Sequence, residues 1–298
     1  MLSLVSKQEY LGREIMKRIH IHDPDKGGIF TLTTGSMGAA KTSVISSFAD
    51  YTTCHHPNEK VFWSECYRAP LQVFRLKSKY HFLVKEDVSL QFRDRNNKHS
   101  SMDIPYTTFT DFNDLYEKAK RGCVNVPFFG NRLYWMGFID HLRNVGEWTH
   151  VFLEELAEIC PSYQDGILWK YIRDWSKETL KDIRKDLINI HANTQVVSNV
   201  DHRVLTYVMV NIFLPGARAF KHSRVTQAAI DNLQRDPVHG HAAYVDASGE
   251  FGVTRFRDIY RPNKSFHVDV IPYNGGERSM SLIPSFIKQR YEIDKTGT

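Results

Sequence analysis

The segment TTGSMGAAKTS, residues 33–43, constrains the fold of this 298-residue chain more than any other stretch. It follows the apolar run GGIFTLT and precedes KTSVISSFADY, which is expected to form a helix. A glycine-containing turn between a strand and a helix, ending in lysine and threonine, is typical of a phosphate-binding loop, because backbone N–H groups and the helix N-terminus then surround an anion. The alternative is an ordinary strand-to-helix turn with a chance lysine. The flanking strand and helix favour the phosphate-binding loop.

Each part of such a loop has a candidate residue. Gly35 turns the chain off the strand, and Gly38 allows the backbone to approach a phosphate closely. Lys41 is expected to span the β- and γ-phosphates, and Thr42 to bind Mg²⁺ through its hydroxyl. Ala40 stands where the usual pattern has glycine; its methyl group is tolerated if φ is negative and costly if the loop needs the left-handed region. We expect the nucleotide to be contacted by Gly35, Ser36, Met37, Gly38, Ala39, Ala40, Lys41, Thr42 and Ser43.

A second candidate segment, THVFLEELAEI, carries an apolar strand that ends in two glutamates. Hydrolysis of ATP needs a carboxylate near the magnesium and a base that positions water. Glu154 is expected near the metal, and Glu155 is expected to activate the water. The familiar order is aspartate and then glutamate, so the longer Glu154 side chain is expected to reach the metal through a water molecule. The alternative is an exposed helix start, since acidic residues favour a first helical turn.

A third candidate segment, LINIHANTQ, is an apolar strand that ends in Asn193-Thr194-Gln195. A neutral polar side chain at the edge of the sheet can sense the γ-phosphate or orient the attacking water, and Gln195 is the candidate for this catalytic role. Alternatively, Gln195 bonds only to the backbone of its own loop.

Apolar runs with strand character alternate with segments of helical period along most of the chain. Strands are expected within residues 27–35, 60–68, 123–129, 150–155 and 187–195, and helices within 41–51, 111–122, 131–146 and 168–186. Such alternation predicts an α/β fold with a mostly parallel sheet flanked by helices on both faces.

The remaining segments depart from this alternation. Residues 70–110 are less regular, and HFLVKE and VSLQFRDR there are expected to form a hairpin or small β insertion. Towards the C-terminus, residues 203–216 read as a strand, 222–234 as a helix, and a β hairpin is expected around Ser248-Gly249. We divide the chain into a helical N-terminal segment (1–26), a P-loop domain (27–262) and a C-terminal extension (263–298).

Composition adds only weak constraints. The net charge of +5 permits contact with a polyanion without requiring it. The four cysteines lie far apart with no C-x-x-C pair, which suits a reducing compartment and argues against a zinc ribbon. Cys54, His55, His56 and Cys66 offer possible metal ligands, but adjacent histidines cannot easily converge on one tetrahedral site. No apolar run approaches the roughly 20 residues of a membrane span, so we expect a cytoplasmic protein of a host cell or a virion-associated one.

Taken together, TTGSMGAAKTS, HVFLEELAEI and ANTQVVSNVDHRV resemble the motifs of the FtsK–HerA superfamily of P-loop ATPases. The likeness is closest to the small ATPases of archaeal viruses and related mobile elements, which include genome-packaging motors. The closing stretch YVDASGEFGVTRFRDIYRP is similar to the strand pair that often ends these chains.

This resemblance implies a RecA-like core that binds ATP and Mg²⁺ and works as a homo-oligomeric ring, typically a hexamer, moving double-stranded DNA through its centre. The motif positions carried over by it are Lys41, Thr42, Glu154, Glu155 and Gln195. A neighbouring subunit is expected to supply an arginine, with Arg173, Arg184, Arg203 and Arg218 as candidates. Two basic groups are candidates for DNA contact, although charged helix faces are usually just solvated; they are Lys177, Lys181, Arg184 and Lys185, and Arg218, Lys221 and Arg224.

We therefore expect an ATP-driven double-stranded DNA translocase, acting in viral genome packaging or mobile-element transfer, with a capsid or portal-vertex protein as a further partner. One alternative is a nucleotide-binding scaffold or assembly protein with weak hydrolysis, to which Ala40 and Glu154 lend weight. The other is a morphogenesis ATPase of the filamentous-phage type, which is expected to carry a membrane-spanning helix that the sequence does not show.

Overall fold

The computed structural model describes residues 27–66, 71–73, 76–93, 104–162, 166–234, 241–255, 267–272 and 283–292. The expected helical segment 1–26 lies outside the described residues, as do parts of the expected extension 263–298.

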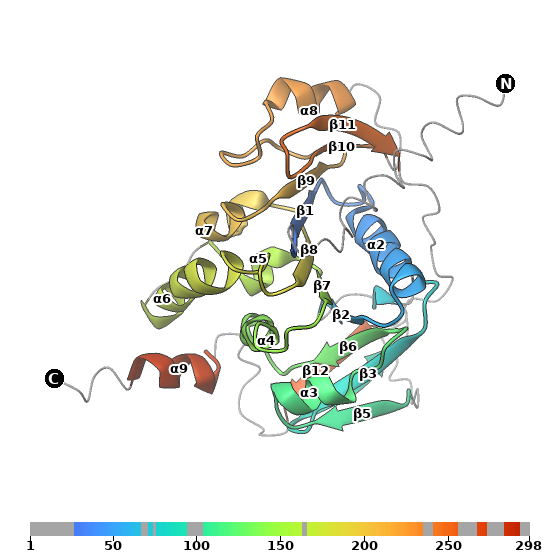
Figure 1. The fold of residues 1–298 in the computed structure, drawn as a ribbon, viewed down its shortest axis with the longest axis vertical. Coiled ribbons are helices and arrows are strands. Elements are labelled where there is room, and N and C mark those ends of the chain that lie inside the picture. The colour runs from blue at the N-terminus through green and yellow to red at the C-terminus, as the bar shows by residue number, and fades with distance from the viewer. Residues whose placement is uncertain are drawn as a thin grey trace.

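A ten-stranded sheet forms the centre of the molecule, with the strand order β11-β10-β9-β1-β8-β7-β2-β6-β3-β5 (Figure 1). All strand pairs from β9 to β5 are parallel, whereas β10 and β11 run antiparallel and form the expected C-terminal hairpin. The strands are β1 (Phe30–Thr34), β2 (Lys60–Ser64), β3 (Tyr80–Lys85), β5 (Tyr106–Phe109), β6 (Val124–Phe128), β7 (Thr149–Leu153), β8 (Ile188–Thr194), β9 (Val210–Phe213), β10 (His241–Val245) and β11 (Phe251–Arg255).

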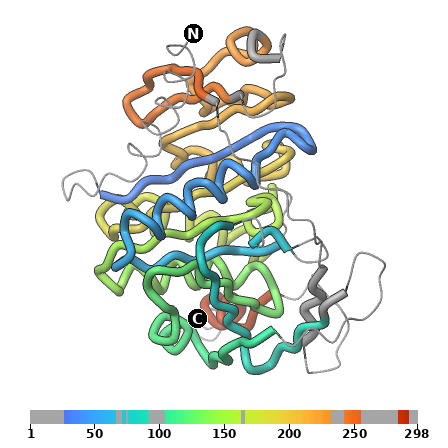
Figure 2. Tube along the Cα trace, turned by 90° about the vertical axis from the view of Figure 1, so that its right-hand side faces the viewer, coloured from blue at the N-terminus to red at the C-terminus, as the bar shows by residue number. Residues whose placement is uncertain are grey.

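Helices cover both faces of this sheet. On one face, α2 (Lys41–His55) lies across the strands (Figure 2). Its Val44, Ile45 and Phe48 belong to the buried apolar cluster on this face. On the other face lie α4 (Tyr134–Leu142), α5 (Leu156–Ile159), α6 (Gly166–Trp175) and α7 (His202–Leu205) (Figure 1). Because the sheet is covered on both sides, every residue of β1, β2, β6, β7 and β8 is buried, as expected for a parallel sheet.

The remaining elements lie around this core. They are α3 (Phe112–Lys118), the π-helix η2 (Ser176–Leu180), the 3-10 helix η3 (Val197–Asn199), α8 (Gln227–Gln234) and α9 (Ser285–Glu292). The Phe286 ring of α9 lies against Tyr134 of α4 and Tyr171 of α6, and Tyr291 donates to Asp174 of α6 at 2.8 Å. Part of the segment expected as a C-terminal extension therefore packs on the P-loop domain.

Two local expectations differ from the structure. The hairpin expected within residues 81–95 does not form: β3 pairs with β6 and β5 inside the main sheet, whereas β4 (Val88–Arg93) pairs antiparallel with β12 (His267–Pro272). The physical reason lies in β3, whose residues 81–84 are buried on both faces, as an interior parallel strand requires. Within the strand expected over 203–216, residues 203–205 belong instead to the helix α7, because the Asp201 carboxylate caps this helix by accepting from the Arg203 backbone N–H.

In a parallel sheet the carboxyl ends of the strands meet at one edge. The phosphate-loop segment follows β1, the two glutamates follow β7, and Asn193-Thr194-Gln195 closes β8. Since β8 lies between β1 and β7, the fold brings all three candidate segments to the same edge.

Candidate nucleotide-binding site

The loop after β1 has an open concave backbone that is anchored at its beginning. Gly38 has a φ of +77°, and a Cβ atom added there would meet nothing within 4 Å. Both the backbone N–H and the hydroxyl of Ser36 donate to the Pro215 carbonyl, at 3.0 and 3.1 Å. The first turn of α2 contains no acidic residue, so the positive end of the helix dipole faces this loop.

Lys41 points into the loop rather than into solvent. Its ammonium donates to the carbonyl oxygens of Gly35 (3.0 Å) and Ser36 (2.8 Å), and the residue is only 8% exposed. Burial lowers the pKa of Lys41, while the charges of Glu155 and Glu154 act in the opposite direction. The ammonium is thus held inside the loop and within electrostatic reach of the two glutamates.

Ala40 adopts the left-handed conformation, which is the costly one of the two possibilities for an alanine at this position. Its φ and ψ are 75° and 22°, which is the left-handed region that glycine occupies with little strain. For alanine this conformation costs roughly 1–2 kcal/mol. The loop therefore keeps the backbone geometry of the glycine-containing pattern although the glycine is missing.

Glu154 lies at the end of β7 and is 4% exposed. Its Oε2 accepts hydrogen bonds from the Thr42 hydroxyl (3.1 Å) and from the Asn193 side-chain amide (2.9 Å). The two residues expected near the metal are therefore brought together from α2 and β7. A hydroxyl and a carboxylate are oxygen ligands of the kind that Mg²⁺ prefers, so the residues present fit this ion.

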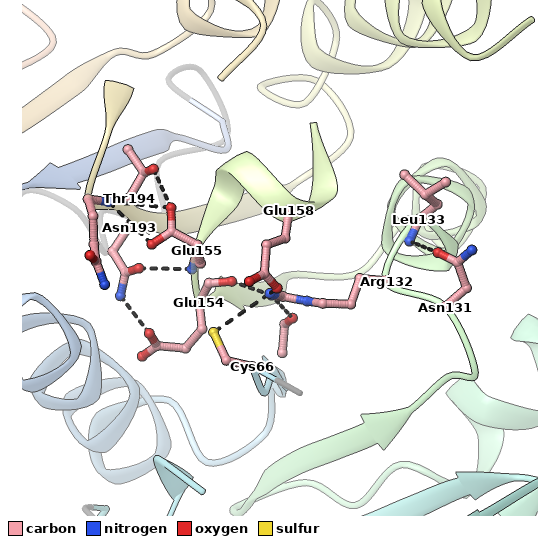
Figure 3. Close-up of polar contacts among 11 residues, drawn as sticks. Cys66, Asn131, Arg132, Leu133, Glu154, Glu155, Glu158, Asn193 and Thr194 are labelled. Carbon is pink, nitrogen blue, oxygen red and sulfur yellow. Dashed lines mark hydrogen bonds and ion pairs between the residues drawn. The ribbon is translucent and has the colours of Figure 1, made fainter. Parts of the chain in front are cut away.

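Glu155 follows in a left-handed conformation, with a φ of 49° and a ψ of 75°. Its carboxylate accepts from the Thr194 hydroxyl at 2.6 Å and from the Gln195 backbone N–H at 3.3 Å, and its own N–H donates to Asn193 Oδ1 at 2.9 Å (Figure 3). The Gln195 side chain is exposed. The strand end of β8 thus orients Glu155 through Asn193, Thr194 and a backbone amide.

Two polar residues beneath this turn were not expected from the sequence. Arg132, in the segment after β6, is 5% exposed and donates to Ser64 Oγ (3.0 Å), to the Glu154 carbonyl and to the Glu158 carboxylate (Figure 3). Glu65, just after β2, is 1% exposed and accepts backbone hydrogen bonds from Gln72 and Val73. Burial raises the pKa of Glu65 to about 8. The sequence offered one indication of both residues. Each follows an apolar strand, and the carboxyl ends of these strands lie at the same edge of the sheet as the phosphate-loop segment.

A cavity of about 560 Å³ lies beside the loop, lined by Gly216, Ala217, Arg218, Gln227 and Asp231. Gly216, with a φ of +79°, connects the two features, because a Cβ atom there would come within 2.5 Å of Ser36 Cβ. On the far side, the Gln227 amide of α8 donates to Asp231 Oδ1 at 2.7 Å. The cavity therefore adjoins the beginning of the phosphate-loop segment on the β9 side of β1.

The four candidate arginines differ in their surroundings. Arg173 pairs with Asp174 at 2.8 Å, and Arg203 pairs with the buried Asp201; both guanidinium groups also lie over the Trp169 ring. Arg184 accepts the Gly28 N–H through its backbone carbonyl at 2.9 Å. Arg218 is exposed and lines the cavity.

Within the ranges that the structure describes, no group of three or more His, Cys, Asp and Glu residues could hold a metal ion. In the same ranges, no helix combines the length and the apolar character needed to cross a bilayer.

The chain resembles known proteins more clearly in structure than in sequence. No family model matches the chain. Its sequence is 24% identical over 186 residues to a homoserine O-succinyltransferase of Shewanella frigidimarina, covering 60% of this chain and 54% of that protein. The chain thus spans about half of the curated relative, and at this identity the likeness does not show a shared family.

Among solved structures, VirB4 of Thermoanaerobacter pseudethanolicus matches with a TM-score of 0.51 at 9% identity, over 80% of this chain and 92% of that one. The genome-packaging NTPase B204 of Sulfolobus turreted icosahedral virus 2, solved with ATP-gammaS, matches with a TM-score of 0.47 at 14% identity, over 80% and 99%. At such low identity the match to VirB4 shows the fold alone. It confirms the expected architecture: the chain has the RecA-like P-loop NTPase fold.

Proposed function

We propose that this chain is a Mg²⁺-dependent ATP hydrolase that drives the movement of double-stranded DNA, in viral genome packaging or mobile-element transfer. The observation that carries the proposal is the buried ammonium of Lys41, held inside the loop after β1 and within electrostatic reach of Glu154 and Glu155. The names of the structural neighbours, a genome-packaging NTPase and VirB4, support the choice of DNA as the partner.

The strand order indicates how a bound triphosphate would be oriented along the edge of the sheet. Glu154 and Glu155 lie on the β8 and β7 side of β1, and the cavity next to Gly216 lies on the β9 side. A nucleotide whose γ-phosphate faces the glutamates therefore extends its nucleoside towards β9. The pocket next to Gly216 lies on this side of the loop and is where the nucleoside would lie.

Each residue at the carboxyl edge of the sheet would have its own role in hydrolysis. Lys41 would exchange the Gly35 and Ser36 carbonyls for oxygens of the β- and γ-phosphates and stabilise the charge that develops on them. Glu155, oriented by Thr194 and the Gln195 N–H, would accept a proton from the attacking water. Thr42 and Glu154 would hold Mg²⁺, which when bound neutralises phosphate charge. The side chain of Gln195 is proposed to sense the γ-phosphate or to orient the water.

Assembly is part of the proposal. A homo-oligomeric ring, a hexamer as in the expected family pattern, would let each site receive an arginine from its neighbour. The proposed location is the host cytoplasm or the virion, with a capsid or portal-vertex protein as the partner during packaging.

The test is phosphate release from ATP by the purified protein, with and without Mg²⁺ and double-stranded DNA. Wild type is expected to turn over and to be stimulated by DNA. Lys41→Ala is expected to lose nucleotide binding, whereas Glu155→Gln keeps binding and loses hydrolysis by a factor of about 100 or more. Wild-type turnover by Lys41→Ala would show that the site is assigned wrongly.

One observation favours a second candidate, a scaffold that binds ATP and hydrolyses it weakly. The loop holds Ala40 in the left-handed conformation at an energetic cost. This departure from the usual glycine suits a protein whose hydrolysis is slow. Tight nucleotide binding with negligible turnover, unchanged by DNA, would support this scaffold over the motor.

A further inference from the structure

We infer that Arg132 is a positioning residue for the two glutamates, an inference that rests on the proposed function of the site. Arg132 lies behind the acidic turn and touches neither Lys41 nor Thr42 in any described hydrogen bond. Its action on the reaction would therefore pass through the main chain of the turn.

The peptide group between Glu154 and Glu155 is held at both ends. Its carbonyl oxygen, which belongs to Glu154, accepts from Arg132, and its N–H, which belongs to Glu155, donates to Asn193 Oδ1 at 2.9 Å (Figure 3). One donor and one acceptor on opposite sides of this planar group fix the orientation of its plane.

This orientation decides where the two carboxylates point. The Glu154 side chain leaves the peptide on one side and reaches Thr42 and Asn193, whereas the Glu155 side chain leaves on the other and reaches Thr194. Glu155 has a φ of 49°, a conformation that persists only where surrounding contacts hold it. Arg132 supplies one of these contacts from behind.

The guanidinium is itself anchored from two further elements. Ser64 Oγ, at the end of β2, accepts from it at 3.0 Å, and the Glu158 carboxylate of α5 accepts from its other terminal nitrogen. A planar fork with several donors can serve the Ser64, Glu154 and Glu158 oxygens at once, and a lysine ammonium on a flexible stem cannot reproduce this geometry. Arg132→Lys therefore keeps the charge and removes the positioning.

The experiment compares Arg132→Lys with Arg143→Lys as a matched control. Arg143, at the end of α4, also pairs with several carboxylates, those of Asp140, Asp182 and Asp186, but has no contact with the acidic turn. Three quantities are measured for each variant: the affinity for a non-hydrolysable ATP analogue in EDTA, the Mg²⁺ concentration that half-saturates the gain in affinity, and kcat.

For Arg132→Lys we expect the half-saturating Mg²⁺ concentration to rise by about 10-fold and kcat to fall by about 100-fold, because support residues of metal sites typically matter by such factors. The metal-free affinity for the analogue is expected to change by less than about threefold, since the loop and Lys41 are untouched. Arg143→Lys should leave all three quantities near wild type. If Arg132→Lys does not fold, Ser64→Ala, which removes one anchor of the guanidinium, should move Mg²⁺ dependence and kcat in the same direction by a smaller factor.

Wild-type Mg²⁺ dependence and kcat in a folded Arg132→Lys would overturn the inference, as would losses of metal-free affinity and kcat in equal proportion. Failure of the proposed function gives a different result, because the wild-type protein would then bind no nucleotide. A wild type that binds the Mg²⁺ complex without hydrolysing it still tests the inference through the metal dependence.

Discussion

At Ala40 the chain places a methyl group on a backbone that glycine adopts with less strain. Replacing it by glycine is expected to stabilise the protein by roughly 1 kcal/mol, because the cost of the left-handed conformation exceeds the entropy that glycine adds to the unfolded chain. Urea unfolding of wild type and Ala40→Gly measures this difference.

Ala39→Gly is the matched control, because Ala39 is the neighbouring residue and is not among those with positive φ. That change is expected to destabilise the protein by roughly 0.5–1 kcal/mol through unfolded-state entropy. Equal destabilisation by both glycines would show that Ala40 carries no strain.

The buried carboxyl group of Glu65 should make the stability of the folded protein depend on pH. Its pKa is raised by burial from 4.5 to about 8, so the folded protein keeps a proton that the unfolded chain releases above about pH 4.5. Stability from this proton is fully present at low pH and is lost as the pH rises towards 8 and above. Relative to Glu65→Gln, wild type should therefore become less stable between pH 5 and 9 by on the order of 1 kcal/mol or more.

Thermal unfolding of both proteins across this pH range measures the effect. A stability difference between wild type and Glu65→Gln that does not vary with pH would mean that Glu65 is ionised throughout.

At the level of single elements, the sequence predicted the strands that form the site because each is a short apolar run buried on both faces. The ends of β1, β7 and β8 could be placed at one edge, since parallel strands share that direction. Strand partners were harder to predict, because β3 and β4 adjoin in sequence yet pair with β6 and β12, which lie far along the chain. Arg132 was missed for the same reason: its contacts come from the ends of β2 and β7, which become neighbours only once the strand order is known.

The segment after β9 is an element whose link to the loop can be tested. A Cβ atom at Gly216 would approach Ser36 Cβ to 2.5 Å, whereas Gly249, with a similar positive φ of +88°, has open space around it. Gly216→Ala and Gly249→Ala should therefore lose a similar backbone contribution of roughly 1 kcal/mol, but only Gly216→Ala should displace the loop.

Titration with an ATP analogue separates the two variants. We expect affinity to fall by about 10-fold in Gly216→Ala, which corresponds to roughly 1.4 kcal/mol, and by less than about twofold in Gly249→Ala, because only the Gly216 methyl group would meet the loop. Equal affinities in two folded variants would mean that the β9 segment does not support the loop.

At the scale of the whole molecule, the edge that carries the site has exposed apolar side chains among the described residues. Met37 in the loop is 83% exposed, Val196 after β8 is 47% exposed, and Trp169 beside Arg173 and Arg203 is 43% exposed. Large apolar side chains exposed beside the proposed site suit an interface between copies, which would cover them. The proposed ring would contain such an interface.

Mixing subunits tests whether the sites work together. Lys41→Ala chains are combined with wild type at equal amounts under conditions that allow exchange, and DNA-stimulated ATP hydrolysis is measured. In a ring whose sites depend on one another, activity should fall below about one quarter of the wild-type value, because most rings then contain several inactive sites. Diluting wild type with an unrelated protein is the control and should give the proportional loss of one half. A proportional loss with Lys41→Ala as well would show that each chain hydrolyses ATP independently.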